Sequence, residues 1–442
     1  MLKKKISTSD LKPGIFAEYD YYSENDKLLI GKGTYVSEEI LNLLNRRNVF
    51  EIYKFITGDE EVNTILNYKL KNLDFLDIDS SDENPLNDYT ENNNKKISNI
   101  LDRKLKNQSI ADIPKGTALK TFATQIEVGK RSEKYFREIS DAYKDSLKLV
   151  QFVFTALLKG KRNCGTQIKE IVTKFVKLFL SDKNILLNIS GIKPKGIEHL
   201  YCHSLNVCIL SINIAASYGY SRDQVIEIGI GALLHDIGMF LIPEEIRHKS
   251  VRFSEAEWFE IKKHPILGLN LLEKLSSIPE SALYVTYQTH ERQNSSGYPK
   301  QRGQHLIHNY AKIVQVADIY EALSSPRPHR KESLPYKSLD SIIKMAKINL
   351  LSLNTVKAFV NYMSTYPIGS LILLTNRCLA KVVDVNPEFL SKPVVSVLSN
   401  SAGNPLAKKE VYQMDLSKNR DTAILKPVPI SQFKQFDIMD GF

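Results

Sequence analysis

The sequence predicts a mainly α-helical protein with a small α/β domain at its start and a small all-β domain at its end. Amphipathic segments of helical periodicity follow one another from about residue 116 to about residue 360. Short β-branched runs separated by turn residues lie before residue 58 and after residue 366. With 442 residues, 43% hydrophobic and 25% charged, the chain is long enough for about two to four domains of ordinary globular composition.

The first domain, residues 1–57, alternates strand-like runs with one amphipathic helix. The strand-like runs are GIFAEYDYY, LLIGKGTYV and VFEIYKFI, and they are separated by polar segments. Between them, Ser37 precedes apolar residues at helical spacing, namely Ile40, Leu43 and Leu44. A serine in that position accepts a hydrogen bond from the first helical turn, so we predict a helix capped by Ser37.

Four further segments complete the predicted organisation. Residues 58–115 are rich in Asp and Asn and can bury little apolar surface, which predicts a polar linker. Residues 116–189 form a helical segment with two long amphipathic helices, and residues 190–365 form a second helical domain. Residues 366–442, with SLILLTN, AKVVDV and PVVSVLS, form the small all-β domain.

Composition excludes several classes of protein. The start of the chain lacks the apolar stretch of a signal peptide, and no apolar run approaches about 18 residues, so we expect no membrane span. The four cysteines form neither a metal-type pair nor a disulfide framework, and we expect a cytoplasmic protein. The net charge of +10 suits an anionic partner or a solvated lysine-rich surface, and no nucleic-acid-binding motif accompanies it. No phosphate-binding P-loop and no serine nucleophile elbow is present.

The most informative feature is a set of histidines and aspartates spread over more than one hundred residues. Imidazole and carboxylate in this ratio suit a borderline metal such as Fe, Mn or Zn better than Mg or Ca. A metal bound there would activate water. The candidates are His203, His235, Asp236, His264, His290 and Asp318, with His199 one helical turn before the first.

Two positions carry most of this interpretation. His235 and Asp236 are adjacent, and a carboxylate can bridge two cations while the neighbouring imidazole binds one of them. Asp318 lies in the apolar helical run IVQVADIYEAL, where an unpaired carboxylate is costly unless it meets a cation or several donors.

A single histidine of this kind is more often an ordinary surface or core residue, so only the whole set of residues indicates a metal site. The helices that carry the set are expected to end at Gly219, at Gly238 and before Pro265. The other histidines lie in polar segments and are interpreted as solvated; they are His248, His305, His308 and His329.

The order H…HD…H…HE…GYP…VAD, followed by PRPHR, resembles the HD-GYP family of cyclic di-GMP phosphodiesterases, a branch of the HD phosphohydrolases. The resemblance covers roughly residues 190–365. LKPGIFAEYD near the start and YPIGSLILLTN near the end also resemble domains that often flank HD-GYP modules. The resemblance implies a multi-helix HD-domain core and hydrolysis of cyclic di-GMP to pGpG or GMP.

Residue by residue, the resemblance implies a role for nine positions. His235 and Asp236 would be catalytic, and two divalent metal ions, Fe or Mn, would bind at the centre. Tyr298 of the GYP motif, Arg327 and Arg330 would contact the substrate, the arginines through its phosphates. The implied metal ligands are His203, His235, Asp236, His264, His290 and Asp318.

The sequence departs from the family pattern at several points. Thr289 stands where a second histidine usually precedes His290, and a threonine hydroxyl is a poor ligand for such a metal. Met239 replaces a lysine, and Asn294-Ser295 replaces the usual Asp-Gly pair. His199 occupies the place of a glutamate that serves a third metal, so two metals are expected.

Three functions stay open at this point. The first is an active cyclic di-GMP phosphodiesterase, and the second is a catalytically silent module that binds cyclic di-GMP or a signalling partner. The third, an HD hydrolase of another phosphate ester, is disfavoured by the intact GYP and PRPHR elements. The partners to be tested are a protein such as a diguanylate cyclase and a second copy of the chain; neither a nucleic acid polymer nor a membrane is expected.

Overall fold

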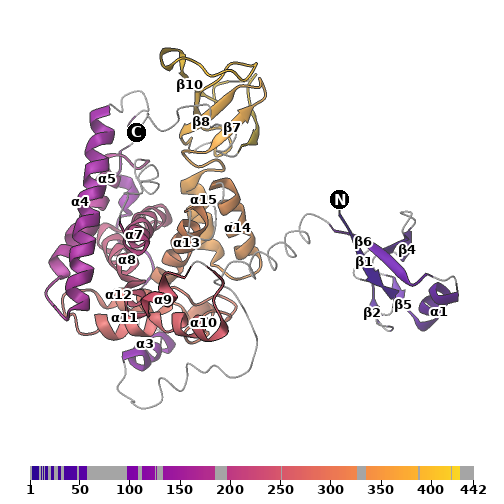
Figure 1. Cartoon of the computed structure of the whole chain (residues 1–442), viewed down its shortest axis with the longest axis horizontal. Helices are drawn as coiled ribbons and strands as arrows, with labels where there is room; N and C mark the ends of the chain where they lie inside the picture. The colour runs from indigo at the N-terminus through magenta and orange to yellow at the C-terminus, as the bar shows by residue number, and fades with distance from the viewer. Residues whose placement is uncertain are drawn as a thin grey trace. The chain divides into compact units, whose positions relative to one another are not determined.

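The computed structural model of the chain contains two compact units, residues 1–79 and residues 80–442, coloured from indigo to yellow in Figure 1. Each unit is described by itself. The structure describes residues 2–8, 11, 13, 15–17, 21–23, 28–30, 34–46, 49–56, 97–107, 112–124, 126, 133–184, 197–249, 251–325, 335–386, 389–419 and 421–428.

The first unit is a small α/β domain, as predicted. Its four-stranded antiparallel sheet has the order β1-β6-β3-β4, formed by β1 (Leu2–Ser7), β6 (Glu51–Ile56), β3 (Tyr21–Tyr22) and β4 (Leu28–Ile30). A second pair joins β2 (Ile15–Phe16) to β5 (Tyr35–Val36). Helix α1 (Glu38–Arg46) begins after Ser37, whose hydroxyl accepts the Ile40 N–H at 3.3 Å, so the predicted cap is confirmed.

Helices make up most of the second unit. They are α3 (Ile97–Lys106), α4 (Glu133–Leu158), α5 (Gly165–Ser181), α7 (His199–Tyr218), α8 (Arg222–Leu234), α9 (Glu244–Arg247), α10 (Glu255–Lys262), α11 (His264–Leu272), α12 (Glu280–Gln288), α13 (Asn309–Ser324), α14 (Pro335–Lys347) and α15 (Leu353–Met363). Short 3₁₀ turns are η3 (Leu119–Phe122), η5 (Ile237–Leu241) and η6 (Gln304–Leu306). The prediction of a mainly α-helical protein is confirmed.

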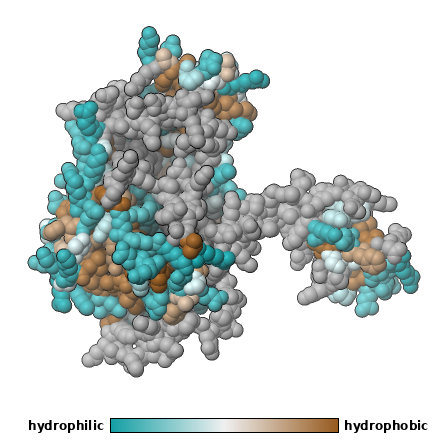
Figure 2. Space-filling model, in the orientation of Figure 1, coloured by the Kyte–Doolittle hydropathy of each residue, from teal (hydrophilic) through white to brown (hydrophobic). Residues whose placement is uncertain are grey.

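Helix α7 is the central helix of this unit. Every residue from Cys202 to Ala216 is buried, and α7 packs against α8, α13 and α15 (Figure 1). Gly219 ends it in the left-handed conformation with φ +111°, as predicted. Helix α7 and the stretch Arg222–Leu241 have the length and apolarity of membrane spans, but 83% and 78% of their apolar windows are buried inside the protein. Burial of this extent is the pattern of core helices. On the face drawn in Figure 2, hydrophobic and hydrophilic residues both lie on the surface of the helical region.

One predicted helix end beside the histidine–aspartate set is wrong, and one is confirmed. Helix α8 ends at Leu234, four residues before Gly238, and the chain passes through His235 and Asp236 into the 3₁₀ turn η5. Helix α10 ends at Lys262, before Pro265, as predicted. Pro265 lies inside the first turn of the next helix, α11, which begins at His264, because proline lacks only an N–H that the first turn leaves unpaired. The metal-type residues of both places thus lie at junctions between helices.

The predicted linker is also corrected in its last part. Residues 97–106 form helix α3, in which Leu101 and Leu105 are buried against the rest of the unit. Their spacing of four residues gives the helix one apolar face. Residues 57–96, which include the Asn-rich run, lie outside the described residues.

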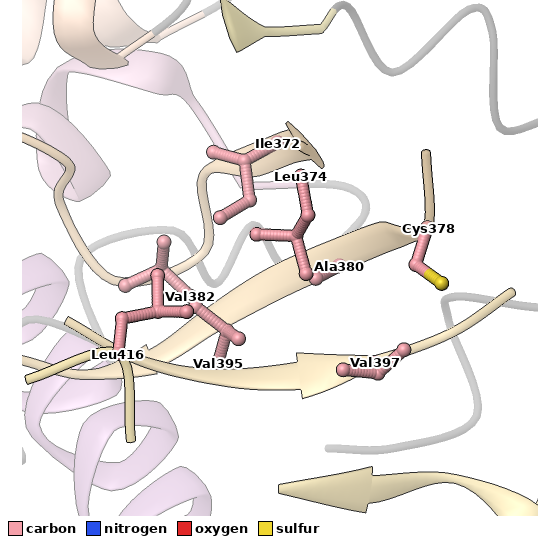
Figure 3. Packing of buried hydrophobic residues seen from close by; sticks show 8 residues of the cluster. All are labelled: Ile372, Leu374, Cys378, Ala380, Val382, Val395, Val397 and Leu416. Carbon is pink, nitrogen blue, oxygen red and sulfur yellow. The ribbon is translucent and has the colours of Figure 1, made fainter. Parts of the chain in front are cut away.

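The chain ends in a small antiparallel β domain, as predicted. Its five-stranded sheet has the order β10-β9-β8-β7-β11, formed by β7 (Leu371–Leu374), β8 (Leu379–Asp384), β9 (Val394–Val397), β10 (Tyr412–Asp415) and β11 (Ile424–Pro427). Alternate residues of β8 and β9 point into one apolar cluster with Ile372 and Leu374 (Figure 3). The Asn184 side chain, just after α5, donates to Asp384 Oδ1 at 2.5 Å and ties the sheet to the helices.

Candidate metal centre

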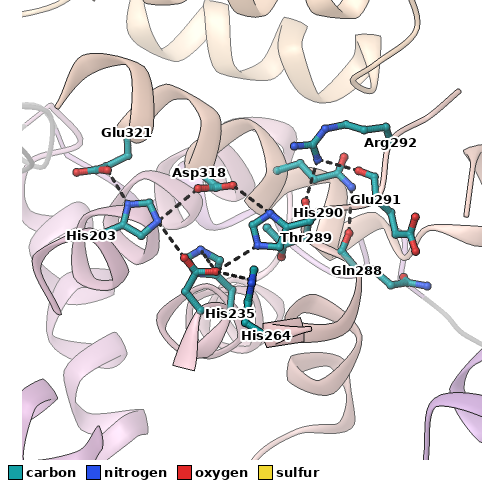
Figure 4. Close-up of polar contacts among 12 residues, drawn as sticks. His203, His235, His264, Gln288, Thr289, His290, Glu291, Arg292, Asp318 and Glu321 are labelled. Atoms are coloured by element: carbon teal, nitrogen blue, oxygen red, sulfur yellow. Dashed lines mark hydrogen bonds and ion pairs between the residues drawn. The ribbon is translucent and has the colours of Figure 1, made fainter. Parts of the chain in front are cut away.

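Six side chains from five separate places in the chain converge beside α7 (Figure 4). His203 lies on the first turns of α7, and Asp318 lies in the middle of α13. The other four occupy helix ends, where no following turn of helix covers them. They are His235 and Asp236 after α8, His264 at the start of α11, and His290 just after α12.

Asp236 is at the centre of this cluster. Its Oδ1 atom lies 3.2 Å from Nε2 of His264, 3.2 Å from Nε2 of His290 and 3.4 Å from Nε2 of His235. Its Oδ2 atom lies 3.6 Å from Nε2 of His203. One carboxylate therefore faces four imidazoles.

The cluster divides into two groups that share Asp236. His203, His235 and Asp236 form one group, and Asp236, His264 and His290 form the other. Within each group, one potential ligand atom per residue lies within 4.8 Å of the others. The second carboxylate, Asp318, spans both groups as well, with Oδ1 3.3 Å from His203 Nε2 and Oδ2 3.9 Å from His290 Nδ1. Two carboxylates that each face both groups suit a pair of cations.

The donor set fits metal ions by its orientation. The Nδ1 atom of His235 donates to the Ala232 carbonyl, and that of His264 donates to the Ile261 carbonyl, each at 2.8 Å. Both contacts fix the tautomer and aim Nε2 into the cluster. These two buried Nε2 atoms have no hydrogen-bond partner in the described structure. A buried acceptor of this kind is costly unless something, such as a metal ion, pairs with it.

Glu321 holds His203 in the same manner, and the sequence reasoning missed it. Its Oε2 atom lies 2.6 Å from His203 Nδ1, and its Oε1 atom accepts from Asn206 at 3.2 Å and from the Ser325 hydroxyl at 2.6 Å. A carboxylate behind a ligating histidine fixes the ring and raises its basicity. The available signal was the spacing, since Glu321 follows Asp318 by three residues and so lies on the same side of the helix.

The charges of the cluster are set by burial and by mutual contact. Burial alone lowers the pKa of His203, but Glu321 and Asp318 outweigh it and raise that pKa to about 10. Burial lowers the pKa of His290 to about 4 against the pull of Asp236. Burial raises the pKa of both aspartates, but the imidazoles outweigh it, so the pKa of Asp236 is well below its usual range and that of Asp318 is about 2. Two ionised carboxylates and a neutral His290 are the protonation states that metal binding needs, whereas His203 must release a proton before it can bind a metal ion.

Thr289 does not point its hydroxyl at the cluster. Its Oγ1 donates to the Val285 carbonyl at 2.7 Å, within its own helix. Arg292 is buried and donates to the Thr289 carbonyl at 3.1 Å, which closes the end of α12. The His290 ring then stacks on Tyr298, with ring centroids 5.0 Å apart and planes 3° apart. The GYP tyrosine therefore lies against the cluster, and the threonine offers it no ligand.

Glu291 fixes the loop that carries the GYP sequence. This buried carboxyl accepts the backbone N–H groups of Lys300 and Arg302, each at 2.7 Å, and burial raises its pKa to about 8. Gly297 allows the loop to lie flat on the chain, because a Cβ there would be 2.4 Å from both Glu291 Cα and the His290 carbonyl oxygen. The loop is thus held on both sides of Tyr298.

The remaining candidates have mixed outcomes. Arg327 and Arg330 lie in residues 326–334, outside the described part of the chain. His199 stacks on His203 at 5.9 Å between ring centroids but belongs to neither metal group. Met239 is half-buried in η5.

One histidine was assigned wrongly. His308 is buried, whereas the sequence reasoning had it solvated; its Nδ1 accepts the Tyr310 N–H at 3.2 Å at the start of α13. Its neighbours in sequence are polar, but the helix start needs an acceptor there. His248 and His305 are exposed as predicted, and His329 lies outside the described residues.

Two family models match the chain. Residues 197–350 match the model described as HD domain, and residues 371–436 match the model described as KOW domain associated with HD domain. The first match contains all six residues of the cluster, and the second covers the β domain.

Curated relatives match over parts of their length. The chain is 27% identical over 272 residues to "Cyclic di-GMP phosphodiesterase PA4108" of Pseudomonas aeruginosa, which covers 61% of this chain and 65% of that protein. It is 27% identical over 225 residues to "Cyclic di-GMP phosphodiesterase PdeB" of Borreliella burgdorferi, covering 51% of this chain and 58% of that protein. A "Cyclic di-GMP phosphodiesterase" of Thermotoga maritima is 33% identical over 159 residues, 36% of this chain and 43% of that protein. The chain thus spans less than two thirds of each of these relatives. Residues 197–350 are thus similar to the HD domain family and carry the motif order of its HD-GYP branch.

Proposed function

We propose that the chain is a metal-dependent phosphodiesterase that hydrolyses cyclic di-GMP in second-messenger signalling. The observation that carries the proposal is the pair of histidine–carboxylate groups that share Asp236, with Asp318 spanning both. The names of the curated relatives give the substrate class, since several are cyclic di-GMP phosphodiesterases. Other relatives are named for the related dinucleotide 3'3'-cGAMP, so cyclic dinucleotides are the class to test.

The proposed ligands are the six residues of the cluster. When bound, two divalent ions would supply Lewis acidity at a phosphoryl oxygen and a hydroxide near neutral pH. Asp236 and Asp318 hold the negative charge of the site, and Glu321 keeps the Nε2 atom of His203 turned inward. His235 and Asp236, adjacent at the end of α8, would serve as ligands and so would help to hold the ions that activate water.

Substrate contacts are proposed outside the ligand set. Tyr298 presents a ring beside His290, and burial raises the pKa of its hydroxyl well above the usual value, so it stays a neutral donor. Arg327 and Arg330 supply guanidinium groups for the phosphates, which they can bind through two hydrogen bonds at once. Iron or manganese as the metal, a cytoplasmic location and pGpG or GMP as the product belong to the same proposal.

The test is purification without oxygen, measurement of bound metal and chromatography of cyclic di-GMP reactions with added Mn²⁺ or Fe²⁺. We expect two metal ions per chain and a linear product. A His264→Ala variant should lose at least about 100-fold in rate together with one of the two ions. The matched control is His305→Ala, which removes an exposed histidine of the same domain and should leave both values unchanged. Two bound ions without product from any cyclic dinucleotide would refute the catalytic proposal.

A second candidate, a module that binds cyclic di-GMP without cleaving it, is favoured by one observation. The Thr289 hydroxyl is bonded to the Val285 carbonyl, so it does not replace the histidine that the family has there. Under this alternative, the wild-type protein binds cyclic di-GMP, measured by calorimetry, and gives no product. A Thr289→His variant that gains turnover would then identify the missing ligand as the cause.

A further inference from the structure

Helix α3 packs against α11 and η6 and contacts α12, although it precedes the HD-domain match by about ninety residues in sequence. The Tyr284 hydroxyl donates to the Leu101 carbonyl at 3.2 Å, and one turn further on the Tyr287 hydroxyl donates to Asp102 Oδ2 at 3.3 Å. At the exposed edge of this contact, the Lys104 ammonium pairs with Glu280 at 2.5 Å. The three α12 residues are four and three positions apart, so they lie on the side of α12 that meets α3.

Asp102 also reaches the loop that carries the GYP sequence. Its Oδ2 atom lies 2.7 Å from an Arg302 guanidinium nitrogen, and both side chains are largely buried. The backbone N–H of Arg302 is held by Glu291, the residue next to His290. A short chain of contacts thus runs from α3 to the far end of α12, where the cluster begins.

Asp112 makes a similar contact with α13, the helix that carries Asp318. One of its carboxylate oxygens accepts the Asn309 backbone N–H at 2.6 Å, and the other accepts the Asn309 side-chain amide at 3.0 Å. Asn309 is the first residue of α13, so Asp112 caps that helix from outside and its charge favours the positive end of the helix dipole.

Residues 112–115 also hold the start of α8, the helix that ends at His235. The Tyr220 hydroxyl donates to the Asp112 carbonyl at 2.8 Å. The Gln224 amide donates to the Ile113 carbonyl at 2.8 Å and accepts the Lys115 N–H at 2.9 Å. The three helices contacted, α8, α12 and α13, carry or directly precede His235, Asp236, His290 and Asp318.

We propose that residues 97–107 and 112–115, which we call the strap, are a positioning element of the metal centre that lies outside the HD-domain match. Asp102 sets the GYP loop and the end of α12, and Asp112 sets the register of α13. Loosening the strap therefore shifts His290 and Asp318 relative to Asp236. The proposal rests on the proposed function only for the binding of metal ions at the cluster.

The test compares Asp112→Asn and Arg302→Gln with the matched control Lys104→Gln. The control removes an ion pair on the same helix whose two side chains are 43% and 49% exposed, and such pairs contribute little. For each full-length variant, the Mn²⁺ concentration at half-saturation is measured by calorimetry, and hydrogen exchange is followed by mass spectrometry. We expect Asp112→Asn and Arg302→Gln to raise the half-saturation concentration about tenfold, which is the lower end of the range for groups that orient metal ligands. Arg302→Lys should recover most of the affinity that Arg302→Gln loses.

Hydrogen exchange distinguishes positioning from general stability. We expect faster exchange in residues 280–325 and unchanged exchange in the β sheet, residues 371–427. Affinities equal to that of Lys104→Gln would overturn the proposal, and so would faster exchange of equal size throughout the chain. If wild-type protein binds Mn²⁺ without hydrolysis, the catalytic proposal fails and the strap is still decided by affinity. If it binds no metal, the metal centre itself fails, and the exchange pattern alone decides the strap.

Discussion

Gly238 offers a sharp test of how the metal centre is built, because it touches no proposed ligand side chain. It lies in η5, two residues after Asp236, where η5 packs on the start of α11. A Cβ at this position would lie 2.0 Å from the His264 carbonyl oxygen and 2.7 Å from the Gly268 nitrogen. Both neighbours are backbone atoms, so neither can rotate away.

The size of the effect follows from these distances. Ordinary contact begins at 3.4 Å, so Gly238→Ala forces η5 and α11 apart by about 1.4 Å along the shorter contact. Asp236 Oδ1 and His264 Nε2, now 3.2 Å apart, move with those two segments. A misplacement of about 1 Å at a reacting centre lowers the rate roughly 100-fold, which corresponds to about 2.7 kcal/mol.

The assay is Mn²⁺ titration by calorimetry together with cyclic di-GMP turnover. We expect Gly238→Ala to lose about 100-fold in affinity for one of the two ions. The control is Gly219→Ala at the C-terminal end of α7, where φ is +111° and nothing lies within 4 Å. Backbone strain there costs about 1–3 kcal/mol of stability without moving a ligand. Two ions bound by Gly238→Ala with wild-type affinity would show that the contact between η5 and α11 does not set the ligand geometry.

Three further predictions concern stability and metal affinity. Glu321→Gln removes the charge behind His203 and should weaken metal binding about 10- to 100-fold. Ser325→Ala removes only a hydrogen-bond donor to Glu321 and should weaken metal binding less. Equal effects of the two variants would contradict the role of Glu321 in orienting His203. Burial lowers the pKa of His308 from 6.5 to about 4, so the folded state resists a proton that the unfolded chain accepts. Stability is therefore complete above pH 6.5 and falls by at most about 3 kcal/mol as the pH drops to 4, and urea unfolding of His308→Gln should lack this loss. Removing bound metal with a chelator should lower the melting temperature, since ions present at about 100 times their Kd stabilise by about 2.7 kcal/mol each; an unchanged temperature would mean that the site was empty beforehand.

The sequence predicted the overall class and the membership of the cluster, because these depend on local periodicity and on residue chemistry. The amphipathic runs of α4 and α5 and the cap at Ser37 are encoded within a few residues. The members of the cluster could be named because the motif order resembles that of the HD-GYP family, and the carboxylate of Asp318 in an apolar helical run indicated a cation.

The errors arose where tertiary contacts decide the structure. Helix α8 stops at Leu234 because the close packing of Gly238 on α11 requires a tighter turn, and no local pattern announces that contact. Helix α3 was missed because its two buried leucines gain their stability only in a unit where α3 packs against α11 and η6. Glu321 and Asp112 act across more than one hundred residues of sequence, so pattern alone could not pair them with His203 and Asn309.

The composition of the cluster has a consequence for the balance of charge. Four imidazoles and two carboxylates carry at most two negative charges when the rings are neutral, while two divalent ions bring four positive charges. Glu321, ionised behind His203, removes one of the two remaining charges, so a loaded centre would hold a surplus of about one positive charge in a buried place, and an anion would be drawn to it. A phosphodiester carries one negative charge, whereas the terminal phosphate of a linear product carries nearly two at neutral pH. The same charge that attracts the substrate thus holds the product more tightly, and release of product is the step expected to limit the rate.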